Sequence, residues 1–336
     1  MSIRLIARAV AGVSLCAAAL SASAFSQLVV FGDSLSDGGN NALLLSSLTG
    51  GVLPPVDVTS DLAYSKIPSA AGTYSNGMVW TQYFAQSLGL PLAPSLAGGT
   101  NFAFGGAQTG LDGAEIPFVP GFPFSMRTQL NMYFSATGNT ANPDALYVVA
   151  GGGNSVRAAL EAIAAGQDAA STAAATVGEY AADMAGLVGD LKQAGAQRIL
   201  VLNTPNFGLT PLAQAWGIGA QASALSWAMD SALSAALTGS GAQVFDMYSF
   251  LTDAVSAGAA LGFSNWTNAC VAAINNCDAS TSLFWDGIHP TTVAHQQLAA
   301  AVLAATVPEP EALLLVAVAL GALGLSRRRR AVAQQG

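Results

Sequence analysis

Charged side chains and metal-binding side chains are both scarce in this chain. Only 9% of its 336 residues are Asp, Glu, Lys or Arg, and it has 2 His and 3 Cys. So few imidazoles and thiols supply few metal ligands, and the glycine run 151–153 lacks the Lys-Ser/Thr ending of a phosphate-binding loop. We therefore expect no metal and no organic cofactor. The scarcity also narrows the choice of a general base to His289 and His295, because imidazole is the side chain that titrates near neutral pH.

Basic residues are fewer than acidic residues in the body of the chain. Residues 25–307 contain 17 Asp and Glu against 5 Lys and Arg. An acidic body opposes binding to nucleic acid and is not attracted to anionic lipid. We expect no nucleic-acid partner.

The first 24 residues have the three parts of a secretory signal peptide. Arg4 and Arg8 form the basic start, residues 9–20 the apolar middle, and residues 22–24 a small-residue cleavage pattern. An uncleaved anchor is the alternative, but the apolar run is shorter than the ~20 residues of a membrane span. Residues 1–24 are therefore expected to be removed on export.

Export would leave an even pair of cysteines. Cys16 would leave with the signal peptide, whereas Cys270 and Cys277 would stay together in an oxidising compartment. A disulfide between Cys270 and Cys277 is expected, and two free thiols are the alternative.

Short apolar runs alternate with Ala-rich stretches of helical spacing between residues 25 and 306. This alternation predicts one α/β domain with a parallel sheet covered on both faces. The expected strands are residues 28–31, 145–150, 199–202 and 244–247, with a weaker candidate at 101–103. The main expected helices are residues 171–194, 212–237 and 292–305.

Polar residues follow the ends of these strands. Ser34 comes after the first strand and Asn154 after another, and open α/β sheets form their sites at the carboxyl ends of strands. Residues 50–71 and 117–124 are irregular insertions that either line a substrate pocket or cap the core. The sequence therefore predicts one rim on which separate segments meet.

Ser34, Asp286 and His289 suit nucleophilic catalysis. A histidine can take the proton of a serine hydroxyl, and a carboxylate three residues before it can orient the imidazole. The alternatives are a helix cap for Ser34 and a surface position for His289. Asp33 and Asp37 are expected to act as turn or capping residues, and His295 as a structural residue; these two aspartates and that histidine have no expected part in the chemistry.

Four blocks in order resemble the GDSL esterases and lipases, also called the SGNH hydrolases. They are Gly32-Asp33-Ser34-Leu35, Asn101-Phe102-Ala103-Phe104-Gly105-Gly106-Ala107, Gly151-Gly152-Gly153-Asn154 and Asp286-Gly287-Ile288-His289. The resemblance implies a flavodoxin-like three-layer sandwich. It also implies catalysis by Ser34, Asp286 and His289, and an oxyanion hole formed by Ser34, Gly105 and Asn154.

Two positions depart from the family pattern. Ser155 stands where the family usually has Asp, and Thr73 stands where a further family segment, residues 72–80, usually has Arg. The oxyanion donor Asn154 is retained, so we expect the chemistry to survive. Ser155 either replaces the hydrogen bonding of the missing Asp or leaves its loop looser.

The C-terminal residues 307–336 resemble the PEP-CTERM sorting tails of Gram-negative bacteria. Pro308-Glu309-Pro310 precedes a short apolar segment, residues 312–325, and then four arginines at 327–330. The resemblance implies a short segment in the inner membrane, held by the cytoplasmic arginines. It also implies processing by an exosortase-like enzyme and a place in the cell envelope; a plain hydrophobic anchor is the alternative.

Together these features predict an exported serine ester hydrolase in residues 25–306. Its substrate would be a lipid, a small ester or an acylated sugar. Two alternatives remain open: an exopolysaccharide deacetylase or acyltransferase, and a non-catalytic envelope or matrix protein that keeps the fold.

Overall fold

The computed structural model describes residues 25–116 and 119–307. The expected signal peptide (1–24) and the tail from residue 308 lie outside this range. None of the helices in the described part combines the length and the hydrophobicity of a membrane span.

A parallel sheet forms the middle of the molecule. Its strands are β1 (Gln27–Gly32), β2 (Ala145–Ala150), β3 (Arg198–Leu202) and β4 (Gln243–Phe245), in the order β1-β2-β3-β4. The weak strand candidate at 101–103 lies on the free side of β1, where the Val30 N–H donates to Thr100 O and Val30 O accepts from the Phe102 N–H. With this segment counted second, the order along the sheet is 2-1-3-4-5, which is the flavodoxin-like order.

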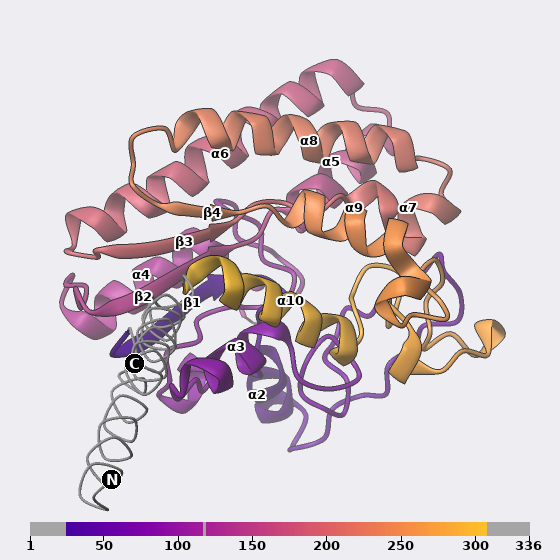
Figure 1. The fold of residues 1–336 in the computed structure, drawn as a ribbon, viewed down its shortest axis with the longest axis horizontal. Coiled ribbons are helices and arrows are strands. Elements are labelled where there is room, and N and C mark those ends of the chain that lie inside the picture. The colour runs from indigo at the N-terminus through magenta and orange to yellow at the C-terminus, as the bar shows by residue number, and fades with distance from the viewer. Residues whose placement is uncertain (1–24, 117–118, 308–336) are drawn as a thin grey trace, which may run out of the picture.

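Alternate residues of the strands point into two separate apolar cores. Val29, Tyr147 and Val201 belong to the core beneath α4 (Met126–Thr137), α5 (Gly153–Ala164), α6 (Ala169–Gln193) and α8 (Gly219–Ala236). Leu28, Val148 and Leu200 belong to the other core, beneath α3 (Trp80–Leu88) and α10 (Thr292–Thr306). Figure 1 shows α6 and α8 on one side of the sheet and α10 and α3 on the other. The three-layer sandwich is confirmed.

Two expected elements have different bounds. The single helix expected at 212–237 is divided into α7 (Pro211–Ala215) and α8, because Gly217 between them has a φ of 71°, in the left-handed region. The strand expected at 244–247 ends at Phe245. The Asp246 side chain accepts the Ser249 N–H and thereby starts α9 (Met247–Ala257).

The remaining elements are short. α2 (Asn40–Leu48) follows the β1 turn. In the described part of the chain, 3-10 turns occupy Ser95–Ala97, Phe207–Leu209, Gly258–Leu261, Ala273–Asn275 and Ala279–Thr281.

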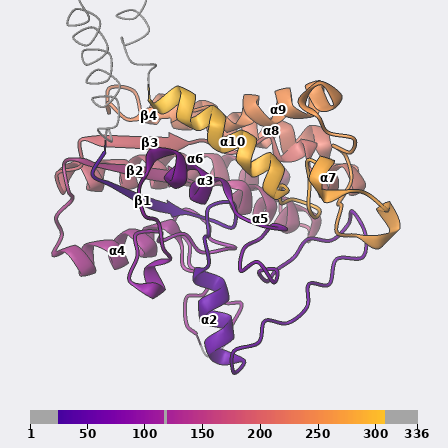
Figure 2. The same cartoon turned by 60° about the horizontal axis from the view of Figure 1, so that its bottom comes forward.

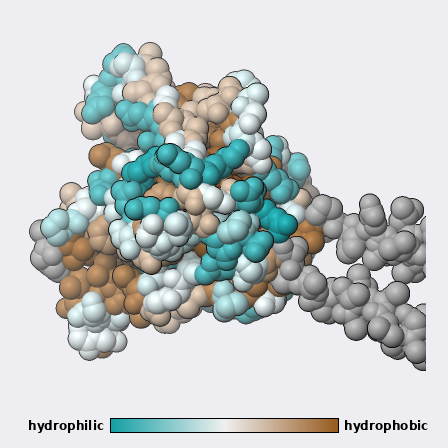
Figure 3. All heavy atoms as spheres, turned by 90° about the vertical axis from the view of Figure 1, so that its left-hand side faces the viewer, coloured by the Kyte–Doolittle hydropathy of each residue, from teal (hydrophilic) through white to brown (hydrophobic). Residues whose placement is uncertain are grey.

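Large apolar side chains are exposed on several elements, two of them, Leu43 and Leu48, on α2. Figure 3 shows the left-hand side of Figure 1, where hydrophilic residues gather across the middle and hydrophobic ones below. The most exposed large apolar residues are Val52, Leu111, Trp227 and Ile274, which lie in loops, in α8 and in a 3-10 turn. Scattered exposure of this kind is ordinary for globular proteins.

The irregular segment 50–71 runs from α2 to the loops that follow α9 (Figure 2). Asp61 joins it to those loops, because its carboxylate accepts hydrogen bonds from the side chains of Asn268 and Asn275 and from the Ala269 N–H. This contact fixes the segment beside the chain that leads to Asp286 and His289.

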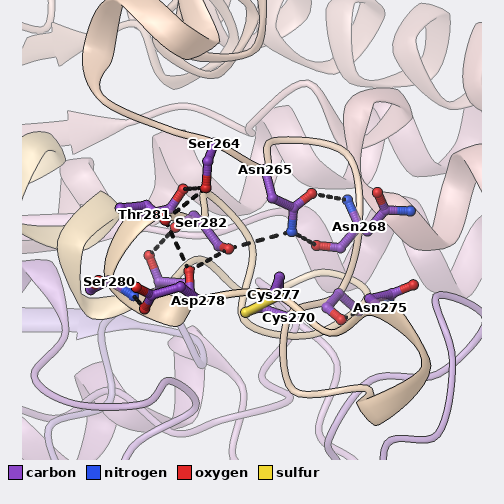
Figure 4. Close-up of a disulfide and its surroundings, with 12 residues drawn as sticks. Ser264, Asn265, Asn268, Cys270, Asn275, Cys277, Asp278, Ser280, Thr281 and Ser282 are labelled. Carbon is purple, nitrogen blue, oxygen red and sulfur yellow. Dashed lines mark hydrogen bonds between the residues drawn. A yellow bond between two sulfur atoms is a disulfide. The ribbon is translucent and has the colours of Figure 1, made fainter.

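A disulfide closes the loop before that histidine. Cys270 and Cys277 are bonded, as expected, among hydrogen-bonded Asn, Ser and Thr side chains (Figure 4). The Cys270 N–H donates to Phe284 O and the Val271 N–H to Trp285 O. The closed loop therefore supports the backbone directly before Asp286.

We predict that the Cys270→Ser/Cys277→Ser double variant loses about 2–3 kcal/mol of unfolding free energy, because the bond restricts the unfolded chain across a short loop. Denaturant titration with and without a reductant measures this loss. Reductant should destabilise the natural protein and leave the double variant unchanged. Alkylation of both thiols in the untreated protein would contradict the prediction.

Candidate active site

Ser34 lies in a tight turn after β1, and it does not cap a helix. The N–H groups of Ser36 and Asp37 donate to Asp33 O, and the Leu35 N–H donates to the Asp33 carboxylate. The next helix, α2, begins at Asn40 with Gly39 as its N-cap. The capping alternative for Ser34 is therefore wrong, and its hydroxyl is left free for another partner.

Gln129 of α4 fixes the backbone just before this turn. Its side-chain Oε1 accepts the Gly32 N–H at 2.8 Å, and its Nε2 donates to Gly32 O at 2.8 Å. The side chain is fully buried. This pairing holds the end of β1 two residues before Ser34.

Ser34, His289 and Asp286 form one hydrogen-bonded chain. His289 Nε2 lies 2.9 Å from Ser34 Oγ, and His289 Nδ1 lies 2.7 Å from Asp286 Oδ2. A neutral imidazole protonated on Nδ1 suits both partners, because it donates to the carboxylate and accepts the serine proton. His289 is only 3% exposed, so the surface alternative for this histidine is wrong.

The fully buried Asp286 carboxylate is held by donors from two segments. Its Oδ1 accepts the N–H groups of Ile288 and His289, at 2.9 and 2.8 Å. Its Oδ2 accepts the Ser65 N–H at 2.8 Å in addition to the His289 ring. The segment 50–71 therefore reaches the site itself and does more than cap the core.

The segment at 72–80 joins the histidine loop to the serine turn. The Ser75 hydroxyl donates to Pro290 O, and Asn76 Oδ1 accepts the Thr292 N–H. The Trp80 indole donates to Ser36 Oγ at 3.1 Å. Thr73, which replaces the usual Arg, donates to Gly77 O within the segment and makes no bond to the serine–histidine pair.

Asn154, at the start of α5, lines both of the cavities that Ser34 lines. Its Nδ2 donates to Ala107 O at 3.0 Å, which leaves its second hydrogen free, and its Oδ1 accepts from Arg157 Nη2 at 3.4 Å. Asn154 lies on the first turn of α5, where the helix dipole presents positive charge. Such a group can stabilise an oxyanion beside Ser34.

The second expected donor requires a correction of one residue. The Gly105 N–H donates to Asp37 Oδ2 at 3.1 Å and is therefore already paired. Among the described residues, the Gly106 N–H has no partner, and Gly106 lines the cavity beside Ser34 and Asn154. Gly106 replaces Gly105 as the candidate donor. Glycine is needed at position 105 for packing, since a Cβ there would lie 2.0 Å from the Tyr74 ring.

Asp37 is the capping residue that the sequence predicts. Its buried carboxylate accepts N–H groups of Gly39, Asn40, Asn41 and Gly105. Burial raises its pKa to about 6, while these N–H bonds act in the opposite direction. Burial also raises the pKa of Asp33 to about 6, against the Leu35 N–H bond and the nearby His289.

A buried carboxyl on α8 contacts the loop that follows β3. Asp230 Oδ1 accepts the Thr204 N–H at 2.9 Å, and Oδ2 has no partner within the described residues. Burial raises the pKa of Asp230 to about 8. Tyr180 donates to Gly151 O at 3.4 Å beside this group.

The Ser155 hydroxyl makes no hydrogen bond in the described part of the chain. Ser155 therefore does not replace the missing family Asp.

Two cavities meet at Ser34 and His289. One has mostly apolar walls and also contains His295. Its apolar walls include Leu35, Phe207, Met247, Phe250, Leu251 and Leu298. The other is polar and is lined by Tyr64, Lys66, Glu115 and Arg157, and the Arg157 guanidinium lies 5.2 Å from the centre of the Tyr64 ring.

The described residues contain no cluster of three or more His, Cys, Asp or Glu side chains that could bind a metal ion together. What they bring together at Ser34 is a hydroxyl, an imidazole, a buried carboxylate and unpaired N–H donors.

Comparisons with known proteins identify the family that this chain matches. Residues 28–302 match the family described as GDSL-like Lipase/Acylhydrolase, and residues 306–330 match the PEP-CTERM protein-sorting motif. The chain is 32% identical over 190 residues to Lipase 1 of Photorhabdus luminescens, covering 56% of this chain and 24% of that protein. It is 26% identical over 324 residues to GDSL esterase/lipase EXL4 of Arabidopsis thaliana, covering 82% and 89%.

The chain thus spans about a quarter of the length of Lipase 1 and most of the length of the plant protein. Among solved structures, the lipase/acylhydrolase from Enterococcus faecalis aligns with a TM-score of 0.41 and 11% identity, over 82% of this chain and 93% of that one.

We predict that Asp230→Asn becomes stabilising, relative to the natural protein, as the pH rises. The folded protein keeps the Asp230 proton to a pH of about 8, whereas the unfolded chain loses it near 3.8. Between these values the unfolded state binds fewer protons, so the natural protein loses stability with rising pH, by at most about 1.4 kcal/mol per pH unit. Denaturant titrations of both proteins between pH 4.5 and 8 measure the difference.

Asp168→Asn is the matched control. Hydrogen bonds from the Ser171 backbone and side chain lower the pKa of Asp168, so its effect should not vary between pH 5 and 8. Equal pH dependence of the Asp230→Asn variant and the natural protein would contradict the assignment.

Proposed function

The chain belongs to the GDSL-like lipase/acylhydrolase family of ester-cleaving hydrolases, and we propose that it is a serine hydrolase that cleaves carboxylic esters through an acyl-enzyme. The observation that supports this proposal is the continuous chain of hydrogen bonds from Ser34 Oγ through His289 to Asp286. A serine hydroxyl needs a base within hydrogen-bond reach, and 2.9 Å meets that condition.

In the first half of the proposed reaction, Ser34 Oγ attacks the ester carbonyl carbon while its proton moves to His289 Nε2. Asp286 stabilises the resulting imidazolium and keeps the ring in place. The tetrahedral intermediate collapses, the bond to the alcohol breaks, and His289 returns the proton to the leaving oxygen. Water then repeats the sequence on the acyl-enzyme and releases the carboxylic acid.

The negative oxygen of the intermediate needs donors that are not already paired. The Ser34 N–H, the Gly106 N–H and the free hydrogen of the Asn154 amide meet this need in our proposal. Removing one such donor typically slows catalysis by about 10²–10³. Arg157 would keep the Asn154 amide turned the right way, because its guanidinium can donate only to the amide oxygen.

The two cavities suit the two halves of an ester. The polar cavity offers Lys66, Glu115 and Arg157 to a hydroxyl-rich alcohol, and the apolar one suits an acyl group. The polar cavity favours acylated sugars as a second candidate substrate class, so deacetylation of a polysaccharide remains consistent with the site. A non-catalytic envelope protein would not need the buried Ser34–His289–Asp286 chain, which argues against that alternative.

We further propose that residues 25–306 act after export. The sorting motif at 306–330 and the signal-like residues 1–24 flank this part of the chain. The tail would direct the protein to the cell envelope and be processed by an exosortase-like enzyme, while the hydrolase domain works outside the inner membrane.

We predict that Ser34→Ala and His289→Ala each reduce kcat for a simple aryl ester by at least 10³, because each removes one half of the proton-transfer pair. The double variant should be little worse than either single variant, since the two residues act as one unit. Steady-state kinetics on the purified protein measure all three.

Ser47→Ala, on the exposed side of α2, is the matched control and should keep natural activity. Folded Ser34→Ala with undiminished turnover would overturn the nucleophile assignment. If the natural protein hydrolyses no ester and no acylated sugar, the non-catalytic alternative holds instead.

A further inference from the structure

His295 is buried without any hydrogen bond to its ring. It lies on the first turn of α10, and its side chain is fully buried. Within the described part of the chain, neither Nδ1 nor Nε2 has a partner. An unpaired polar group is costly to bury, and native proteins rarely leave one without a reason.

The ring lines the same cavity as the proposed nucleophile. The apolar cavity is bounded by Ser34 and His289 together with His295 and carbon-rich walls. It is narrow, with a volume of about 60 Å³. Since one water occupies roughly 10–15 Å³ of such space, the cavity fits a short chain of a few atoms. Away from Ser34 and His289, the His295 imidazole is thus the lining group whose polar atoms have no hydrogen-bond partner.

The His295 imidazole stays uncharged near neutral pH. Burial lowers its pKa to about 3, and the neighbouring His289 acts in the same direction. A neutral imidazole carries one N–H donor and one acceptor nitrogen. A hydroxyl group can pair with either nitrogen, because it donates to the acceptor or accepts from the N–H.

We propose that His295 is a specificity-determining residue that binds a hydroxyl group on the acyl chain of the substrate, so that the preferred substrates are esters of short hydroxy acids. This proposal rests on the proposed function, because it requires an ester bound at Ser34. The apolar walls hold the carbon chain, and the His295 imidazole selects acyl chains that carry a hydroxyl group.

The hydroxyl belongs to the acyl group rather than to the alcohol. A polar alcohol already has Lys66, Glu115 and Arg157 in the second cavity. The apolar cavity contains no Lys, Arg or Glu, and its acid, Asp33, lies beside the serine turn. An acyl chain in this cavity therefore meets one unsatisfied polar partner, His295.

The test compares matched aryl esters of butanoate, 2-hydroxybutanoate and 3-hydroxybutanoate on the full protein. The natural protein should prefer at least one hydroxy ester over butanoate by 10-fold or more in kcat/KM, since a site built to bind a hydroxyl discriminates against the analogue without it. His295→Leu should abolish this preference, measured as the ratio of kcat/KM for the hydroxy ester to kcat/KM for butanoate. His295→Asn, which keeps a donor and an acceptor, should retain part of the preference.

The outcomes separate this inference from the proposed function. If the natural protein hydrolyses all three esters without preference, or if His295→Leu keeps the natural preference, the hydroxyl assignment is overturned and the esterase assignment stands. If no ester is hydrolysed, the proposed function itself fails. Should His295→Leu not fold, His295→Phe, which keeps a ring but has no polar atom, takes its place, and an unchanged preference in that variant would overturn the assignment.

Discussion

The buried carboxylate of Asp286 is the constraint on which the rest of the site depends. It accepts hydrogen bonds from the N–H groups of Ser65, Ile288 and His289 and from the His289 ring. A buried charge of this kind is tolerated only when its acceptor positions are filled. These four bonds join the irregular segment 50–71 to the histidine loop and fix the imidazole plane. One carboxylate therefore both holds these two segments together and orients the proposed base.

The sheet then brings the other components to this carboxylate. In the observed strand order, the chain passes from β1 to the segment 101–103 on one side and then to β2 on the other side, so the order of the connections reverses between β1 and β2. Ser34 and Asn154 follow these two strands. Ligand sites in open α/β sheets form at this point because the neighbouring connections leave on opposite faces. The turn after β1 is held by Gln129 from one face and by Trp80 from the other, so the proposed nucleophile is fixed from both layers.

Much of this arrangement can be predicted from the sequence, and the features that cannot be predicted have physical causes. Buried parallel strands are continuous apolar runs, so β1 to β3 could be located, and two histidines leave little choice of base. Ser65 contributes only a backbone N–H from a segment without periodicity, which gives no residue-type signal. Gly105 and Gly106 are adjacent, and only the bond from Gly105 to Asp37 shows which N–H remains free. His295 resembles a core residue until its unpaired ring is seen beside the cavity.

The most direct test of the account is the rate at which an aryl phosphonate labels the protein, followed by mass spectrometry of the labelled peptide. The account predicts one adduct, on Ser34, because among the described residues only this hydroxyl has a base at 2.9 Å that is itself oriented by a carboxylate. The folded fraction of Asp286→Asn should be labelled more slowly by roughly 10²–10⁴, since the imidazole loses its orienting charge. Labelling of a different serine, or equal rates in the natural protein and Asp286→Asn, would contradict the account.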